Sequence, residues 1–176
     1  MTVEENITLG LRDHEVRGIY VKTKANEYAD KRHTPAQLSE LVREKLALVG
    51  LYGIEKAKPA NLSGGMRKRV GLARALAMDP AYMFYDEPTT GLDPVSSDVI
   101  DGLIAELTQR LKVTSIIVTH DMFTVYRIAK RVIFLFEGKV YFDGTPDALK
   151  ISEDPAVRKF LKRYEEVAPA DRKVGV

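Results

Sequence analysis

The first part of the chain shows the spacing of apolar residues that is typical of helices. Val3–Leu11 is a short amphipathic segment. Thr34 and Pro35 form a typical helix start, and Gly50 is a typical stop. Between them apolar residues recur every three or four positions: Leu38, Leu41, Val42, Leu46 and Val49. A further helix is predicted from Ser63 to about Met78, so the amino-terminal part of the chain is predicted to be helical.

After Tyr82 the chain alternates between strands and helices. Tyr82–Asp86 and Ser115–Thr119 are short runs of mostly apolar residues, which predicts strands buried on both faces. Val95–Leu111 has one apolar side and is predicted to be the helix between them. Two such strands joined by a helix form a parallel βαβ unit, so the fold class is predicted to be α/β.

The carboxyl-terminal part is predicted to contain a short helix, a hairpin and a last helix. The helix is expected over Asp121–Ala129. Glu137 and Gly138 are typical of a tight turn between the strands Arg131–Phe136 and Lys139–Phe142. The last helix is predicted over Pro155–Tyr164.

Composition narrows the classes of protein that remain. The chain has 176 residues, 45% of them hydrophobic, and a net charge of +2. Near-neutral charge gives no support for a nucleic-acid partner, and none is expected. The absence of cysteine excludes disulfides, zinc–thiolate sites and thiol nucleophiles. The longest apolar runs, Ala81–Tyr85 and Val132–Phe136, are far shorter than the roughly 20 residues of a membrane helix. With no signal-peptide pattern at Met1, a cytosolic chain is predicted.

Ser63, Gly64 and Gly65 form the first candidate site. Ser63 stands where the cap of the next helix is expected, and the two glycines leave the first-turn amides uncovered. Bare amides and a hydroxyl at a helix start can bind a phosphate group. An ordinary serine cap with glycines in a turn is the simpler alternative.

Asp86 and Glu87 form the second candidate site, at the end of a predicted strand. Open α/β sheets bind ligands at this edge. Because successive strand residues point to opposite sides, the two carboxylates can serve different partners. One carboxylate can bind Mg²⁺, and the other can polarise a water molecule for attack. An acidic strand end that caps the next turn is the alternative.

Asp93 and His120 follow the same two strands. Asp93 ends the restrained turn that starts at Pro88, where it can cap the next helix or reach another site. His120 comes directly after the second strand and is therefore expected beside Glu87, at the same edge of the sheet. A histidine there is either structural or a partner for a γ-phosphate.

The order of these motifs resembles that of the ATP-binding-cassette (ABC) ATPases. Leu62-Ser63-Gly64-Gly65 resembles their signature motif, and Tyr82–Asp86 followed by Glu87 resembles their Walker B strand and catalytic glutamate. Gly91-Leu92-Asp93-Pro94 resembles their D-loop, and His120 resembles their switch histidine. The resemblance extends from Thr2 to about Phe160.

This resemblance implies a fold, two cofactors and a set of partners. The fold would be the carboxyl-terminal part of a P-loop (RecA-like) ATPase. Residues 1–80 would form a helical subdomain, 81–150 the rest of the α/β core, and 151–176 a carboxyl-terminal helix and tail. The cofactors would be ATP and Mg²⁺. The partners would be a second ATPase subunit in a head-to-tail dimer and a transmembrane permease, which would hold the protein at the inner face of the cell membrane.

The resemblance also implies a role for each candidate residue. Asp86 would hold Mg²⁺, Glu87 would polarise the attacking water and His120 would contact the γ-phosphate. The ATP of the partner subunit would be clamped by Ser63, Gly64 and Gly65. Asp93 would link the two ATP sites.

Two motifs of this family are absent from the sequence. No glycine begins a Gly-x-x-x-x-Gly-Lys-Ser/Thr phosphate-binding loop, and the Q-loop glutamine is missing. The chain therefore resembles the carboxyl-terminal two-thirds of such an ATPase. We expect the isolated chain to hydrolyse ATP poorly or not at all, since phosphoryl transfer depends on positioning and charge neutralisation. We also expect exposed strand edges, exposed apolar surface and self-association.

A narrower resemblance concerns ATPases of Mce-type lipid transporters, which are implicated in phospholipid movement and organic-solvent resistance. It rests on Met66, on Gly144-Thr145-Pro146 and on the segment 154–161. A lipid-type transporter subunit is therefore the favoured hypothesis.

Three alternatives remain. The chain could be the carboxyl-terminal lobe of a non-transport relative in DNA maintenance, although no heptad run precedes Leu62. It could be a silent partner that lends its signature motif to another ATPase, although a silent site has no need of Glu87 and His120. A small α/β binding domain would require all four motifs to be coincidental. The run Arg67-Lys68-Arg69 is interpreted as a solvated or partner-facing surface rather than an anion site.

Overall fold

The computed structural model describes residues 1–17 and 34–167, which form two compact units divided after Ile117. Residues 18–33 and 168–176 lie outside the described residues, and the tail expected at the end of the chain falls within the second of these ranges. The first unit contains, in chain order, α1 (Val3–Arg17), α2 (Pro35–Leu48), the 3₁₀ turn η1 (Pro59–Asn61), α3 (Gly64–Leu76), β1 (Tyr82–Asp86), α4 (Pro94–Leu111) and β2 (Thr114–Val118).

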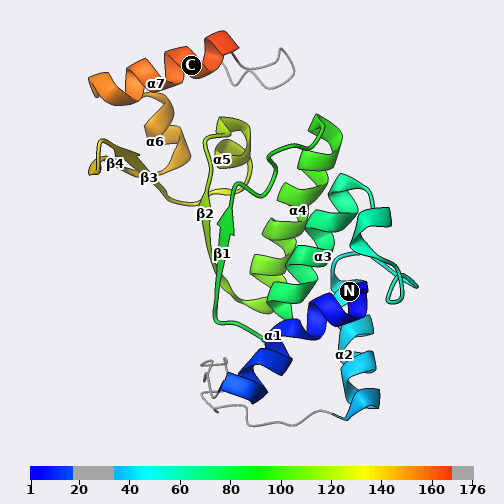
Figure 1. Cartoon of the computed structure of the whole chain (residues 1–176). Helices are drawn as coiled ribbons and strands as arrows, with labels where there is room; N and C mark the ends of the chain where they lie inside the picture. Colours follow the sequence, from blue (N-terminus) through cyan, green and yellow to red (C-terminus); the bar gives the residue numbers. More distant parts are fainter. Residues whose placement is uncertain (18–33, 168–176) are drawn as a thin grey trace. The chain divides into compact units, whose positions relative to one another are not determined.

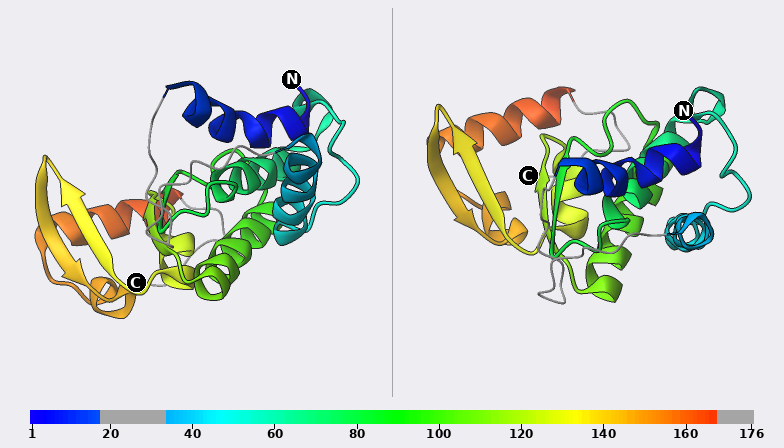
Figure 2. Two further views of the ribbon diagram at one scale, coloured as in Figure 1. Left: turned by 90° about the horizontal axis from the view of Figure 1, so that it is seen from below. Right: turned by 60° about the horizontal axis from the view of Figure 1, so that its bottom comes forward.

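Helices α1, α2 and α3 pack against one another in the first unit (Figures 1 and 2). Their apolar positions recur at helical spacing and are buried, as the sequence pattern predicts. The buried side chains of these three helices include Val3, Ile7, Val42, Leu46, Val70, Ala73 and Leu76. Helix α1 continues past Leu11 to Arg17, because a helix can extend beyond the part that carries its apolar stripe.

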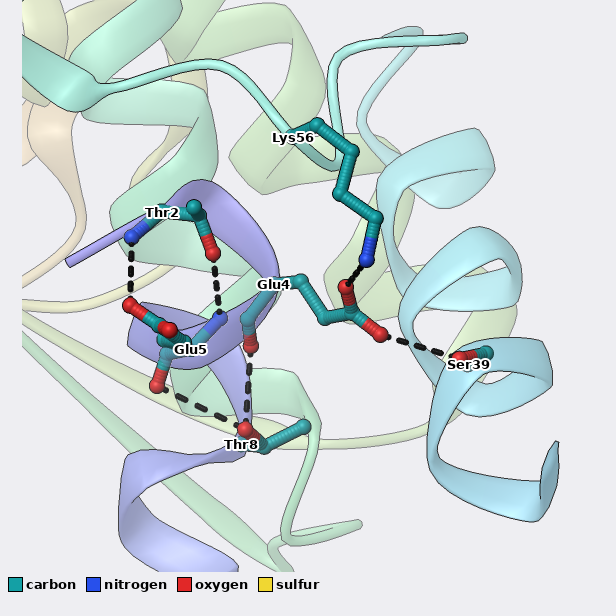
Figure 3. A network of polar contacts seen from close by, with 6 residues as sticks. All are labelled: Thr2, Glu4, Glu5, Thr8, Ser39 and Lys56. Carbon is teal, nitrogen blue, oxygen red and sulfur yellow. Dashed lines mark hydrogen bonds and ion pairs between the residues drawn. The ribbon is translucent and has the colours of Figure 1, made fainter. Parts of the chain in front are cut away.

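Glu4 joins three segments of this helical region (Figure 3). Its carboxylate accepts a hydrogen bond of 2.9 Å from the Ser39 hydroxyl on α2 and forms an ion pair with Lys56 in the loop before η1. The backbone amides of Val3 and Glu4 donate to the carbonyls of Ala57 and Glu55. These contacts attach the start of α1 to α2 and to the loop that leads toward Ser63.

Thr34 caps α2 as its sequence predicts. Its hydroxyl accepts from the Gln37 amide at 3.3 Å, and the Gln37 side chain accepts from the Thr34 amide at 2.8 Å. This reciprocal pair is a capping box with Pro35 in the first turn. Two amides that the helix cannot satisfy internally are thereby bonded.

We expect the substitution Thr34→Ala to lower the free energy of unfolding by about 0.5–2 kcal/mol, because it removes this cap. Urea denaturation followed by circular dichroism measures the loss. The control is Gln109→Ala on the exposed side of α4, which should change the free energy by less than about 0.5 kcal/mol. Equal values for the two variants would contradict the prediction.

A buried lysine forms ion pairs with two exposed carboxylates at the other end of the helical region. The Lys45 ammonium on α2 donates to Asp79 at 2.7 Å and to Glu44 at 3.1 Å, and its side chain is 7% exposed. Burial acts to lower the pKa of Lys45, but its bonds with Asp79 and Glu44 outweigh that effect and the pKa is raised. Lys45 therefore keeps its charge and holds α2 to the turn that follows α3.

Strands β1 and β2 pair in a two-stranded parallel sheet, and α4 connects them. The predicted βαβ unit is therefore confirmed. The prediction that both strands are buried on both faces is wrong. Met83 and Tyr85 are buried, whereas Tyr82 and Phe84 on the opposite face of β1 are exposed. The reason is that the described residues cover only one face of this sheet.

The exposed face includes the neighbouring strand. On β2 the side chains of Ile116 and Val118 are 44% and 60% exposed, and on β1 that of Phe84 is 75% exposed. The expectation of exposed apolar surface is therefore confirmed for this chain. Self-association through that surface stays a prediction.

The second unit contains, in chain order, α5 (Met122–Ile128), β3 (Val132–Phe136), β4 (Lys139–Gly144), α6 (Pro146–Lys150) and α7 (Pro155–Val167). The predicted hairpin is confirmed: β3 and β4 are antiparallel, with a register shift between Phe134 and Leu135. Helix α7 packs against β4. Among its described residues the core is small: partly buried hydrophobic side chains pack around Met122, Leu149, Val157 and Leu161, which are buried.

The second unit also contains an ion pair at the hairpin and a short additional helix. Arg131 and Asp143 form a two-point ion pair beside the hairpin, with distances of 2.7 and 2.6 Å. Helix α6 was not predicted, although Thr145 caps it and Pro146 starts it. In the part of the chain that the structure describes, no helix is both long and apolar enough to cross a membrane.

Candidate functional site

Ser63 caps helix α3. Its backbone is extended, and its hydroxyl accepts a hydrogen bond of 3.2 Å from the Met66 amide. Within residues 1–17 and 34–167 the structure gives no acceptor for the amides of Gly64 and Gly65. Ser63 is exposed, so the hydroxyl and both amides form a donor-rich helix start that suits an anionic group.

Asp86 and Glu87 follow one another at the carboxyl end of β1. Asp86 is exposed on the same face as Phe84. Glu87 is half-buried and has a φ of +46°, in the left-handed region. The left-handed backbone at Glu87 turns the chain away from the strand direction just after β1 ends at Asp86.

Two groups hold the backbone and side chain of Glu87. Thr90 donates its hydroxyl to Glu87 Oε2 at 2.9 Å and its amide to the Glu87 carbonyl at 3.3 Å. Lys68, on α3, donates its ammonium to the same carbonyl at 3.2 Å. The turn after β1 is therefore bonded both within itself and to the neighbouring helix.

Arg67 is exposed, whereas Lys68 and Arg69 are half-buried, and the interpretation of the three as a partner-facing surface stays a prediction. Each of them donates to a backbone carbonyl: Arg67 to Leu62 at 2.6 Å, Lys68 to Glu87, and Arg69 weakly to Val49 and Gly50. No sequence pattern connects Lys68 with Glu87, because that contact depends on how α3 packs on the turn. The one sequence signal that could have pointed to this contact is the position of a basic residue, Lys68, close to the start of α3.

Asp93 caps α4. Its carboxylate accepts from the Ser96 amide at 2.9 Å and from the Ser96 hydroxyl at 2.6 Å. The hydrogen bonds from the Ser96 side chain and then its backbone lower the pKa of Asp93, so the group is ionised at neutral pH. The alternative of Asp93 as a helix cap is confirmed. A second role in reaching another site stays a prediction.

The start of α3 packs closely on the turn between β1 and α4. A Cβ atom at Gly64 would lie 3.3 Å from Leu92 Cδ2, which is tighter than ordinary van der Waals contact. A Cβ atom at Gly65 would lie 3.9 Å from Ser96. The structure therefore brings Ser63, Gly64 and Gly65 together with the turn that contains Glu87 and Asp93.

His120 belongs to the second unit and lies two residues after the end of β2. Its side chain is exposed. The next residue, Asp121, caps α5 through the Phe123 amide at 3.0 Å and accepts from the Tyr164 hydroxyl at 2.9 Å. The place of His120 after the second strand is as the sequence predicts. Its expected position beside Glu87 stays a prediction.

The carboxylates suit a magnesium ion that is also bound by phosphate. Within the described ranges no three acidic or histidine residues form a cluster that could hold a metal alone. Mg²⁺ is usually held by one or two carboxylates together with substrate phosphates and water. One exposed carboxylate, that of Asp86, beside a turn that presents Glu87 fits this arrangement.

Comparison with known proteins gives a family match over the first half of the chain. The family model described as "ABC transporter" matches residues 1–90. This range includes Ser63, Gly64, Gly65, Asp86 and Glu87.

Two curated relatives match over most of the chain. The "Probable ribonucleotide transport ATP-binding protein mkl" of Mycobacterium tuberculosis is 38% identical over 161 residues, covering 92% of this chain and 40% of the relative. The "Intermembrane phospholipid transport system ATP-binding protein MlaF" of Escherichia coli is 42% identical over 137 residues, covering 76% of this chain and 51% of MlaF. The chain thus spans about half, or less, of the length of these relatives.

A solved structure agrees with the fold. It is the dimeric post-hydrolysis state of an ATP-binding cassette bound to ADP and Pi, with a TM-score of 0.65 and 27% identity, covering 83% of this chain and 57% of that one. The predicted fold class, the carboxyl-terminal part of a P-loop ABC ATPase, is confirmed. Together with the family match over half of the chain, this shows that the chain belongs to the ABC transporter family.

Proposed function

We propose that this chain is part of the ATP-binding and ATP-hydrolysing subunit of an ABC transporter, and that the transporter moves lipids. One observation carries the ATPase part: the Asp86–Glu87 pair lies at the end of β1, in a turn that is bonded to the helix capped by Ser63. This arrangement supports the proposal, because two carboxylates and a helix start with uncovered amides belong to the same unit.

Each residue has a proposed task in that reaction. Asp86 holds the Mg²⁺ ion, which when bound neutralises phosphate charge. Glu87 accepts a hydrogen bond from the attacking water and orients it. Its carboxylate is kept in place by Thr90. His120 donates to the γ-phosphate, which requires that the second unit bring it to the site.

The helix start and the turn before α4 serve the partner subunit. Ser63, Gly64 and Gly65 donate hydrogen bonds to the ATP that the partner subunit binds, and Asp93 connects the two ATP sites. The dimeric cassette bound to ADP and Pi supports a paired arrangement of this kind. A transmembrane permease would be the other partner, and it would hold the ATPase at the inner face of the membrane.

The lipid part of the proposal rests on the printed name of MlaF, an intermembrane phospholipid transport protein, and on its 42% identity. The name of mkl points to ribonucleotides instead. Both cargoes can be tested in the assembled transporter reconstituted in vesicles. Transfer of a labelled phospholipid that requires ATP supports the lipid proposal. ATP-dependent uptake of labelled uridine monophosphate without lipid transfer would overturn it.

The ATPase part is tested by supplying a phosphate-binding loop. We expect the chain alone to show little or no ATP turnover, because Ser63 and Glu87 do not replace a loop that cradles the β- and γ-phosphates. The DNA upstream of the Met1 codon is read in frame, and the longer protein, if it contains Gly-x-x-x-x-Gly-Lys-Ser/Thr, is assayed for phosphate release. Turnover in the longer protein that depends on Glu87 supports the proposal. Equal turnover in the chain alone would contradict the expectation.

A further inference from the structure

Lys68 is the one basic side chain of the first turns of α3 that reaches the turn after β1. Its ammonium lies 3.2 Å from the Glu87 carbonyl, and the contact is partly buried. Hydrogen bonds from charged donors are stronger than those between neutral groups, especially away from bulk water. The contact therefore fixes the peptide that follows Glu87 more firmly than the weaker 3.3 Å bond from the Thr90 amide alone.

The hydrogen bond from Lys68 matters because the backbone of Glu87 has an unfavourable conformation that needs support. With a φ of +46°, Glu87 occupies a region that residues with a side chain visit rarely. A non-glycine residue stays there only when its surroundings hold it. The carbonyl bond from Lys68 and the side-chain bond from Thr90 at 2.9 Å hold the two ends of the same residue.

Lys68 also belongs to the helix that Ser63 caps. Gly64, at the start of that helix, packs on Leu92 of the same turn. The start of α3 and the Glu87 turn are thus joined at two points, Lys68–Glu87 and Gly64–Leu92. A shift of either one displaces the other.

We propose that Lys68 is a positioning residue for Glu87, which it ties through the Glu87 carbonyl to the helix that carries Ser63. This inference rests on the proposed ATPase function for its catalytic consequence. Lys68 does not touch the reacting atoms in this role. It determines where the Glu87 carboxylate lies relative to the attacking water, and misplacement of a reacting group by about 1 Å can lower a rate by about 100-fold.

The first experiment needs no ATP. Hydrogen–deuterium exchange is measured over residues 86–93 in the chain and in three variants. In Lys68→Met the Thr90 amide should exchange about three to ten times faster, the factor that corresponds to loss of one ordinary hydrogen bond. Lys68→Arg retains a donor and should exchange like the unmodified chain. Lys58→Met is the matched control, because Lys58 has no polar side-chain partner among the described residues.

Two outcomes of this experiment overturn the proposal. One is unchanged exchange over residues 86–93 in Lys68→Met. The other is an equal acceleration in Lys58→Met. Exchange over the β3–β4 hairpin, followed in the same samples, separates a local change from general unfolding. This experiment can be interpreted even if the proposed function is wrong.

The second experiment uses the assembled ATPase with a phosphate-binding loop. Lys68→Met should lower kcat by about 10- to 100-fold and leave the KM for ATP within about twofold, as expected when only the orientation of the base is lost. Lys68→Arg should restore kcat. Thr90→Val, at an exposed position where folding is not at risk, removes the other bond to Glu87 and should lower kcat in the same way. A raised KM with unchanged kcat in Lys68→Met would assign Lys68 to ATP binding through α3 and overturn the proposal.

Discussion

Replacing Glu87 with glutamine should lower ATP turnover of the assembled ATPase by about 10²- to 10⁴-fold, the contribution that a positioned general base makes. Glutamine has nearly the same size and can still accept the hydrogen bond from Thr90 Oγ1, which lies 2.9 Å from Glu87 Oε2. It cannot take a proton from water or orient it through a negative charge. ATP binding should therefore persist while hydrolysis becomes much slower.

A matched control exists in the hairpin turn. Glu137 also has a φ of +46° and is exposed, and no role in the reaction is proposed for it. Glu137→Gln should leave turnover unchanged, which shows that loss of one carboxylate at a left-handed position is not itself harmful. The measurements are phosphate release and binding of a fluorescent ATP analogue. Full turnover in Glu87→Gln would place the base elsewhere and remove the main support for the proposed mechanism.

The second large effect concerns stability. Leu161→Ala should lower the free energy of unfolding of the second unit by about 2–5 kcal/mol, since it deletes buried methyl groups and leaves a cavity. Leu161 is 1% exposed and is one of the four buried apolar residues around which the described part of this unit packs. Small units bury a smaller share of their surface, so their free energy of unfolding is small. A loss of this size should unfold much of residues 118–167.

Amide exchange over β3, β4 and α7 measures the effect at 25 °C, and the thermal midpoint gives a second reading. The control is Ile151→Ala, because Ile151 is 77% exposed and its truncation should cost less than about 0.5 kcal/mol. If Leu161→Ala protects these amides as well as Ile151→Ala does, the four-residue core does not hold the unit together.

Local signals in the sequence predicted the helix starts and the strands well. Thr34, Ser63 and Asp93 each cap the helix that follows them, because the bond that defines such a cap spans only three residues. The hairpin turn at Glu137 and Gly138 is local in the same way. The start of α6 carried the same kind of signal in Thr145 and Pro146, and it could have been found.

Features that depend on packing could not be predicted. An apolar run such as Tyr82–Asp86 indicates a strand but not what covers each face, and Tyr82 and Phe84 are exposed here. The contact between Lys68 and Glu87 joins residues from a helix and a strand end whose relative position no local pattern encodes. Of the candidate site, the position of Asp86 and Glu87 at the end of β1 was therefore predictable, but the groups that hold Glu87 were not.

The left-handed backbone at Glu87 sets a trade-off for any effort to make this protein more robust. Such a conformation costs a residue with a side chain on the order of 1 kcal/mol or more, and glycine adopts it without that cost. A screen that rewards heat resistance alone would favour glycine at this position and so discard the carboxylate. Directed evolution of this fold should therefore select for turnover in every round, since the strained position holds the carboxylate that is proposed to act as the base.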